Sequence, residues 1–274
     1  GLAVLLGEPL GTLLLTLAVT LIEAAMISAV MFGDHGTPTL ARDAMFAVLM
    51  IMLNGMTGLS LLLGGLRYGE QTYNLQGANA FLAVIVPLAT LVLILPNFTT
   101  TTPGPTLSSL QSVFLVVMSV GLYGVFLAIQ NRRHRDYFLD PNPETASDAP
   151  HAHGHEVRSV RYHAPLLVAY LLPLVYLAEQ LALPLNHAIE VFEAPAALGG
   201  FLVAVLILSP ESLAALRAAR ANQLQRAVNV LLGSVLASIS LTVPAVLLLG
   251  FYTEKPVVLG LASVDMVLLL LTLV

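Results

Sequence analysis

Long apolar runs, separated by short polar turns, dominate the chain. Eight of these runs reach the roughly 20 residues that a membrane-spanning helix requires, and they cover residues 10–32, 43–66, 78–98, 107–130, 164–183, 196–216, 227–251 and 257–274. The breaks carry turn-forming residues such as Gly33-Asp34-His35-Gly36 and Pro103-Gly104-Pro105. A soluble helical bundle is the alternative, but its helices would carry polar stripes, and several of these runs have almost none. The pattern predicts an all-α, polytopic membrane protein.

Composition agrees with this class, because 57% of the 274 residues are hydrophobic and only 10% are charged, whereas soluble domains average about 25% charged residues. The net charge of −5 gives no indication of a nucleic-acid partner. There is no cysteine, so oxygen or histidine would have to hold any metal. Because the sequence starts at Gly1 and stops inside an apolar run, we expect it to be part of a longer protein.

The basic residues indicate the orientation, since they collect in cytoplasmic loops. The loops after residues 66, 130 and 216 lie on one side and hold nine of the eleven: Arg67, Arg132, Arg133, Arg135, Arg158, Arg161, Arg217, Arg220 and Arg226. We therefore predict that this side is cytoplasmic and that the chain has three parts: a first transmembrane repeat over 1–130, a cytoplasmic loop over 131–163, and an incomplete second repeat over 164–274.

The loop 131–163 is rich in Asp, Pro, Ala and His and has no apolar periodicity. Its histidines, His151, His153 and His155, could bind a transition metal or respond to pH. A solvated spacer is the simpler interpretation, and the sequence leaves both open.

Two glutamates interrupt the apolar runs. Glu23 lies about midway along the run 10–32, and Glu211 lies well inside the run 196–216. An ionised carboxylate near the bilayer centre costs about 2.5–3.5 kcal/mol on insertion scales, so such a residue suggests a function. An interhelical hydrogen bond or a protonated side chain without a role is the alternative for each. Together they predict a cation site within the membrane.

Oxygen atoms near these glutamates suit a hard cation such as calcium. Pro210 cannot donate a backbone hydrogen bond and so frees the carbonyl of Leu206. Thr20 shares a helix face with Glu23 by its spacing. In the spans that follow each glutamate, Asn54 and Ser234 are the better candidate ligands, although small and polar residues there also serve close helix packing.

The two halves also match each other in outline. In each half an embedded glutamate is followed by a turn and then by a span with small and polar residues, and the two pairs run in opposite directions across the membrane. We therefore predict an inverted repeat, with the cation site near the midplane between the repeats, as in many secondary transporters.

The sequence resembles the calcium/proton exchangers of the cation–calcium exchanger superfamily, in particular their bacterial sodium–calcium/proton antiporter branch. The resemblance rests on Gly7-Glu8-Pro9-Leu10-Gly11 through Leu21-Ile22-Glu23, and on Leu208-Ser209-Pro210-Glu211 through Asn222-Gln223, Gln225-Arg226-Ala227, Gly233-Ser234 and Ser240-Leu241-Thr242-Val243-Pro244. It implies eleven helices, of which two would precede residue 10 and one would follow residue 274, and a location in the bacterial inner membrane. Where the family has Gly-Asn before each glutamate, this chain has Val19-Thr20 and Ile207-Leu208.

The resulting hypothesis is a secondary antiporter, not an enzyme, that exchanges calcium for protons at one site shared by Glu23 and Glu211, with alternating access and no bound cofactor. Sodium or potassium exchange against protons on the same scaffold is the first alternative, and the sequence does not distinguish them. An intramembrane hydrolase is a remote alternative, because none of the seven histidines lies inside an apolar run. The oligomeric state has no signature in the sequence.

Overall fold

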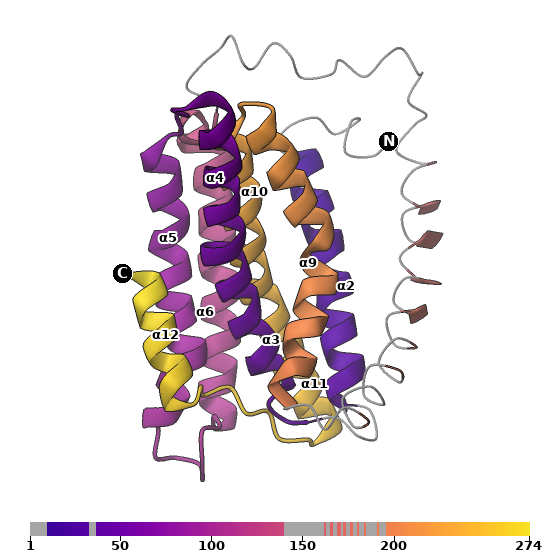
Figure 1. Ribbon diagram of the computed structural model, residues 1–274. Helices are drawn as coiled ribbons and strands as arrows, with labels where there is room; N and C mark the ends of the chain where they lie inside the picture. Colours follow the sequence, from indigo (N-terminus) through magenta and orange to yellow (C-terminus); the bar gives the residue numbers. More distant parts are fainter. Residues whose placement is uncertain are drawn as a thin grey trace.

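The computed structural model describes residues 10–32, 37–139 and 196–274, together with scattered positions between 162 and 191. In the described part, the helices run side by side along a common direction and form one bundle (Figure 1). Four continuous helical stretches are long and apolar enough to cross a membrane: Leu40–Tyr68, Leu75–Phe98, Ser109–Asn131 and Leu224–Thr253. The prediction of a polytopic all-α membrane protein is confirmed.

The first half follows the predicted apolar runs to within a few residues. Its elements are α2 (Leu10–Phe32), α3 (Leu40–Leu49), η1 (Met50–Met56), α4 (Thr57–Tyr68), α5 (Leu75–Ala89), η2 (Thr90–Ile94), η3 (Leu95–Phe98), α6 (Ser109–Ala128), η4 (Ile129–Arg133) and η5 (Arg135–Phe138). Side chains cap two of these helices: Asn74 accepts from the Gln76 N–H at the start of α5, and Ser108 forms a capping box with Gln111 at the start of α6.

The second half consists of α9 (Ala196–Arg220), α10 (Leu224–Ala237), η6 (Ser238–Thr242), α11 (Val243–Thr253) and α12 (Ser263–Leu273). The span predicted over 257–274 is wrong at its start, because its helix begins only at Ser263. Other backbone groups hold the extended segment before it: the Val258 N–H donates to the Pro38 carbonyl and the Leu261 N–H to the Leu93 carbonyl, both at 2.9 Å. The span predicted over 164–183 and most of the loop 131–163 lie outside the described residues.

The two glutamate-bearing helices pack across the boundary between the halves. Helix α2 contacts η6, α11 and α10 from the second half, whereas α9 contacts α3, η1 and α4 from the first half. The core between them is apolar and tightly filled, with Ile27, Met45, Met52, Leu208 and Leu236 all essentially inaccessible to solvent. Each glutamate-bearing helix therefore packs against the polar span of the opposite half.

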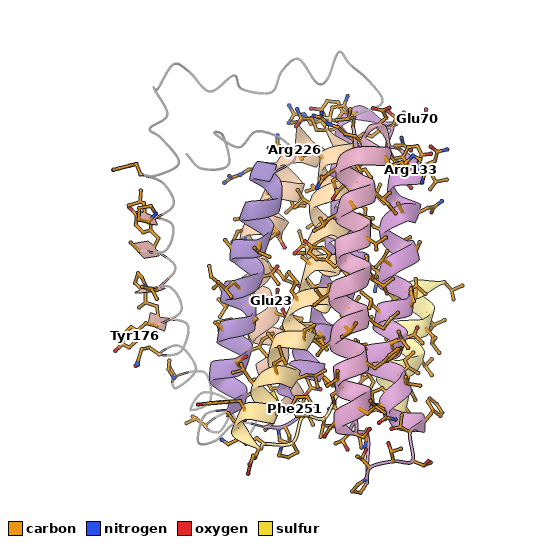
Figure 2. The ribbon with its side chains drawn as sticks, turned by 180° about the vertical axis from the view of Figure 1, so that it is seen from behind. Glu23, Glu70, Arg133, Tyr176, Arg226 and Phe251 are labelled. Atoms are coloured by element: carbon orange, nitrogen blue, oxygen red, sulfur yellow. The ribbon has the colours of Figure 1, made fainter. Side chains whose placement is uncertain are left out.

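One end of the bundle carries most of the charged groups, and we call it the arginine-rich end. Glu70, Arg133 and Arg226 lie there, Phe251 lies at the opposite end, and Glu23 lies about halfway between (Figure 2). That this end faces the cytoplasm stays a prediction.

Hydrogen bonds tie the turns of the arginine-rich end together. The Gln71 side-chain amide donates to the Ala219 carbonyl at 3.1 Å and to Asn222 Oδ1 at 2.9 Å. Gln225 Oε1 accepts from the Asn74 N–H at 2.6 Å. Asn222 and Gln225, which belong to the motif that carries the family resemblance, therefore join the two halves at this end.

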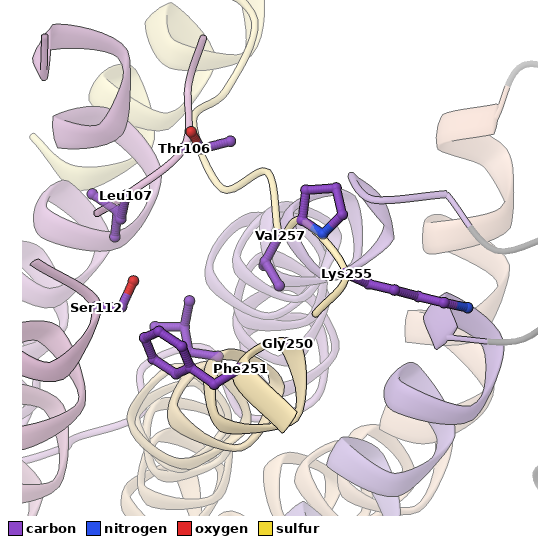
Figure 3. A pocket seen from close by; sticks show the side chains of 9 residues that line it. Thr106, Leu107, Ser112, Gly250, Phe251, Lys255 and Val257 are labelled. Atoms are coloured by element: carbon purple, nitrogen blue, oxygen red, sulfur yellow. The ribbon is translucent and has the colours of Figure 1, made fainter. Parts of the chain in front are cut away.

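The opposite end contains a pocket of about 210 Å³ between α6, α11 and the segment after α11. Thr106, Leu107 and Ser112 line one side, and Gly250, Phe251, Lys255 and Val257 line the other (Figure 3). Its wall is mostly apolar, with two hydroxyl groups on the α6 side.

Candidate cation site

Glu23 lies near the middle of α2 with only 2% of its surface exposed. Ser238 Oγ donates a hydrogen bond of 2.6 Å to Glu23 Oε2. The other carboxylate oxygen, Oε1, is buried and has no hydrogen-bond partner among the residues that the structure describes. A buried carboxylate oxygen without a donor is costly unless a proton or a cation satisfies it.

Glu211 follows Pro210 inside the long helix α9. It is partly buried, and its Oε2 atom is buried and likewise lacks a partner within the described ranges. Its charge contributes to the electrostatic environment of Glu23, although burial of Glu23 is the larger contribution. The two acidic groups are separated by 188 positions in sequence, and both lie on helices that pack across the boundary between the halves.

The segment η6, which contains Ser238, also holds further buried hydroxyl groups. The segment Ser238–Thr242 is a π-helical turn between α10 and α11, and such turns in α-helices are frequent at functional sites. Besides Ser238, Ser240 and Thr242 are fully buried, and their hydroxyls have no partner in the described part of the chain. The span that follows α2, the helix of Glu23, also contains a π-helical segment, η1, which includes Asn54.

The predicted additional ligands differ in how far they are buried. Thr20 is buried one turn before Glu23 on α2, and Ser234 is partly buried one turn before Ser238 on α10. Asn54 is exposed, and its amide donates to Thr272 Oγ1 of α12 at 2.9 Å. The Leu206 side chain is 48% exposed on α9. Thr20 and Ser234 remain near the glutamates by position, whereas Asn54 contacts the short C-terminal helix.

Ser238 is the site residue that sequence reasoning did not select. A signal was present, because Ser234, Ser238 and Thr242 follow one another at four-residue spacing and so lie along one face of a helix. What the sequence could not show is that this face meets α2, since the contact joins residues 215 positions apart.

The acidic groups alone do not make a metal cage. Within the described residues, no group of three or more His, Asp or Glu side chains could hold an ion together. A cation between Glu23 and Glu211 would therefore need hydroxyl, carbonyl or water oxygens to complete its coordination. The hydroxyl of Ser238, which contacts Glu23, supplies one oxygen of this type.

Comparison with known proteins shows the family of this chain. The model of the family described as sodium/calcium exchanger protein matches residues 2–131. The chain is 42% identical over 273 residues to a protein of Sinorhizobium fredii named as an ionic transporter, y4hA, and the match covers 99% of this chain and 74% of that protein. The chain belongs to the sodium/calcium exchanger family.

A further relative and a solved structure extend the comparison. The Escherichia coli sodium-potassium/proton antiporter ChaA is 40% identical over 270 residues, which cover 98% of this chain and 73% of ChaA. The solved structure of native YfkE superposes with a TM-score of 0.68 over 93% of this chain and 71% of that chain, at 16% sequence identity, and so supports the fold. Membership of the family makes this chain a membrane cation antiporter and gives the intramembrane hydrolase no support.

Proposed function

We propose that this protein exchanges calcium for protons across a bacterial inner membrane, at one site that Glu23 and Glu211 share. The observation that carries the proposal is that each half contributes a glutamate with a buried carboxylate oxygen that lacks a hydrogen-bond partner among the described residues. Thr20, Ser234, Asn54 and the Leu206 carbonyl remain the predicted additional ligands.

Electrostatic repulsion between the two carboxylates couples the flux of the cation to the flux of protons. Two ionised carboxylates in a low-dielectric interior repel each other, and either protons or a divalent cation remove that repulsion. The empty site with two charges is too costly to pass through the apolar core, so the protein changes its access only when the site holds protons or the cation. Competition for the same oxygens then produces exchange instead of leak.

The arrangement of helices supports alternating access between the halves. Because α2 packs on η6 and α11 while α9 packs on α3 and α4, a movement of one half against the other changes the surroundings of both glutamates together. This is the behaviour expected of an inverted repeat with a site at the midplane, with the arginine-rich end toward the cytoplasm.

Exchange of sodium or potassium against protons is the second candidate. It is favoured by the 40% identity to ChaA, which is named for those two ions. In this case the same carboxylates would hold a monovalent cation in place of calcium.

Everted membrane vesicles that contain the full-length protein test both candidates. After an imposed pH gradient, calcium should dissipate the gradient and accumulate in the vesicles, and both signals should vanish in Glu23→Gln and in Glu211→Gln. Glu70→Gln is the matched control, because Glu70 is exposed at the arginine-rich end. Dissipation by sodium or potassium but not by calcium would select the second candidate, and exchange retained by both site variants would refute the shared site.

A further inference from the structure

A groove at the arginine-rich end, outside the cation site, has the features of a lipid-binding site. It has a volume of about 450 Å³ and is lined by Leu63, Leu66 and Arg67 of α4 and by Arg220 of α9. The two helices pack against each other, and their ends lie next to one another at the top of the bundle (Figure 1).

The ends of α4 and α9 are joined by a hydrogen bond, and both arginine side chains are exposed and available to a ligand. Tyr68 Oη donates to the Arg220 carbonyl at 2.7 Å, which ties the end of α4 to the end of α9. The Arg67 guanidinium lies 5.4 Å from the centre of the Tyr68 ring. In the described part of the chain the single ion pair joins Arg42 and Asp43, so no described carboxylate neutralises either groove arginine.

Below the arginines the surface is apolar. Leu59, Leu62 and Leu66 follow one another at spacings of three and four on α4, with exposed fractions of 38%, 56% and 78%. On α9, Leu213 is 53% exposed, one to two turns before Arg220. The groove therefore offers positive charge at the level of lipid headgroups and hydrocarbon toward the membrane interior.

We propose that this groove binds one anionic phospholipid, whose phosphate is held between Arg67 and Arg220 and whose acyl chains lie along the exposed leucines of α4. Guanidinium groups bind phosphate oxygens in pairs of charge-assisted hydrogen bonds. Basic pockets between transmembrane helices on the cytoplasmic side suit anionic headgroups. The proposal does not depend on which cation the protein exchanges.

Native mass spectrometry of the delipidated full-length protein tests the proposal. Phosphatidylglycerol should remain bound to the wild type at collision energies that remove phosphatidylcholine with the same acyl chains. Arg67→Gln combined with Arg220→Gln should lower the apparent affinity for phosphatidylglycerol about tenfold or more. Arg133→Gln combined with Arg135→Gln is the control, because both side chains are exposed at the same end and neither lines the groove.

Three outcomes would overturn the proposal. An equal loss in the control pair would mean diffuse electrostatic attraction. Equal retention of phosphatidylcholine would mean an apolar surface without headgroup recognition. A dimer that disappears in the groove variant, with no lipid adduct on the wild type, would mean that a second copy of the chain occupies the groove.

If the double variant is not monodisperse, Arg67→Gln and Arg220→Gln are used singly, and each should lower the affinity for phosphatidylglycerol severalfold.

Discussion

The hydrogen bond between Ser238 and Glu23 joins a site carboxylate directly to the opposite half. At 2.6 Å it is short, as expected of a hydroxyl that donates to a carboxylate. It fixes one carboxylate oxygen and leaves the other without a described partner. Ser238 thus positions Glu23 so that one oxygen remains available to the transported ion.

Replacing Ser238 by alanine should weaken cation binding and leave the protein folded. A hydrogen bond to a charged group contributes about 1.5–3 kcal/mol, so we expect the KM for the transported cation to rise about tenfold or more, with a smaller change in maximal rate. Vesicle transport at several cation concentrations measures both. Ser119→Ala is the control, because its buried hydroxyl makes no hydrogen bond with the described residues, and an equal rise in KM there would argue against a specific role for Ser238.

For single residues, the sequence predicted the buried glutamates but not the side chains that contact them. Glu23 and Glu211 could be predicted because an acidic residue in an apolar run is energetically exceptional. Ser238 could not be separated from the other hydroxyls of its span, since serine is common in packed transmembrane helices. The position of Asn54 against Thr272 depends on where α12 packs, which no local pattern specifies.

At the scale of elements, close approach of backbones decides how the helices meet at the arginine-rich end. Gly77 lies in the first turn of α5, where its Cα faces the backbone of Tyr137 in η5. A Cβ at this position would collide with the Tyr137 carbonyl group, with the carbonyl carbon at 3.1 Å. Nearby, three aromatic rings pack together with centroids 4.8–5.8 Å apart: Phe138 meets Phe81 and Phe126 edge to face, and Phe81 and Phe126 are tilted against each other.

Gly77→Ala should therefore destabilise the protein. Because backbone atoms block the added methyl group, we expect a loss of about 1–3 kcal/mol, as for other overpacked positions, seen as a lower Tm in detergent. Gly121→Ala on α6 is the matched control: a Cβ there meets nothing within 4 Å, and alanine favours the helix over glycine by about 1 kcal/mol. A Tm of Gly77→Ala at or above that of Gly121→Ala would contradict the packing at η5.

The apolar runs predicted the existence of the described helices well, because a membrane span must be both long and apolar. They did not predict the π-helical segments η1, η2, η4 and η6, which change the register by one residue without changing hydropathy. The apolar pattern also predicted a last helix that starts too early, because the apolar residues before Ser263 form an extended segment. Its carbonyl at Gly260 accepts from Arg42 Nη1 at 3.1 Å, a contact between residues 218 positions apart.

At the scale of the molecule, the two halves contribute different surroundings to the same pair of charges. Glu23 receives a hydroxyl donor from η6, whereas Glu211 follows a proline in α9 and lies in a less buried position. The sequence predicted that the two glutamates share one site and that Pro210 frees the Leu206 carbonyl near Glu211. It could not predict which half supplies the donor, since this depends on how the halves pack.

Calcium-triggered proton release from the purified full-length protein in unbuffered detergent solution tests the shared site most directly. If Glu23 and Glu211 hold one ion together, calcium should release protons from the wild type, and either Glu23→Gln or Glu211→Gln alone should abolish the release. The double variant should then behave like each single variant. Loss of only part of the release in each single variant, with calcium affinity unchanged and the two losses additive, would show two independent carboxylates and contradict the account.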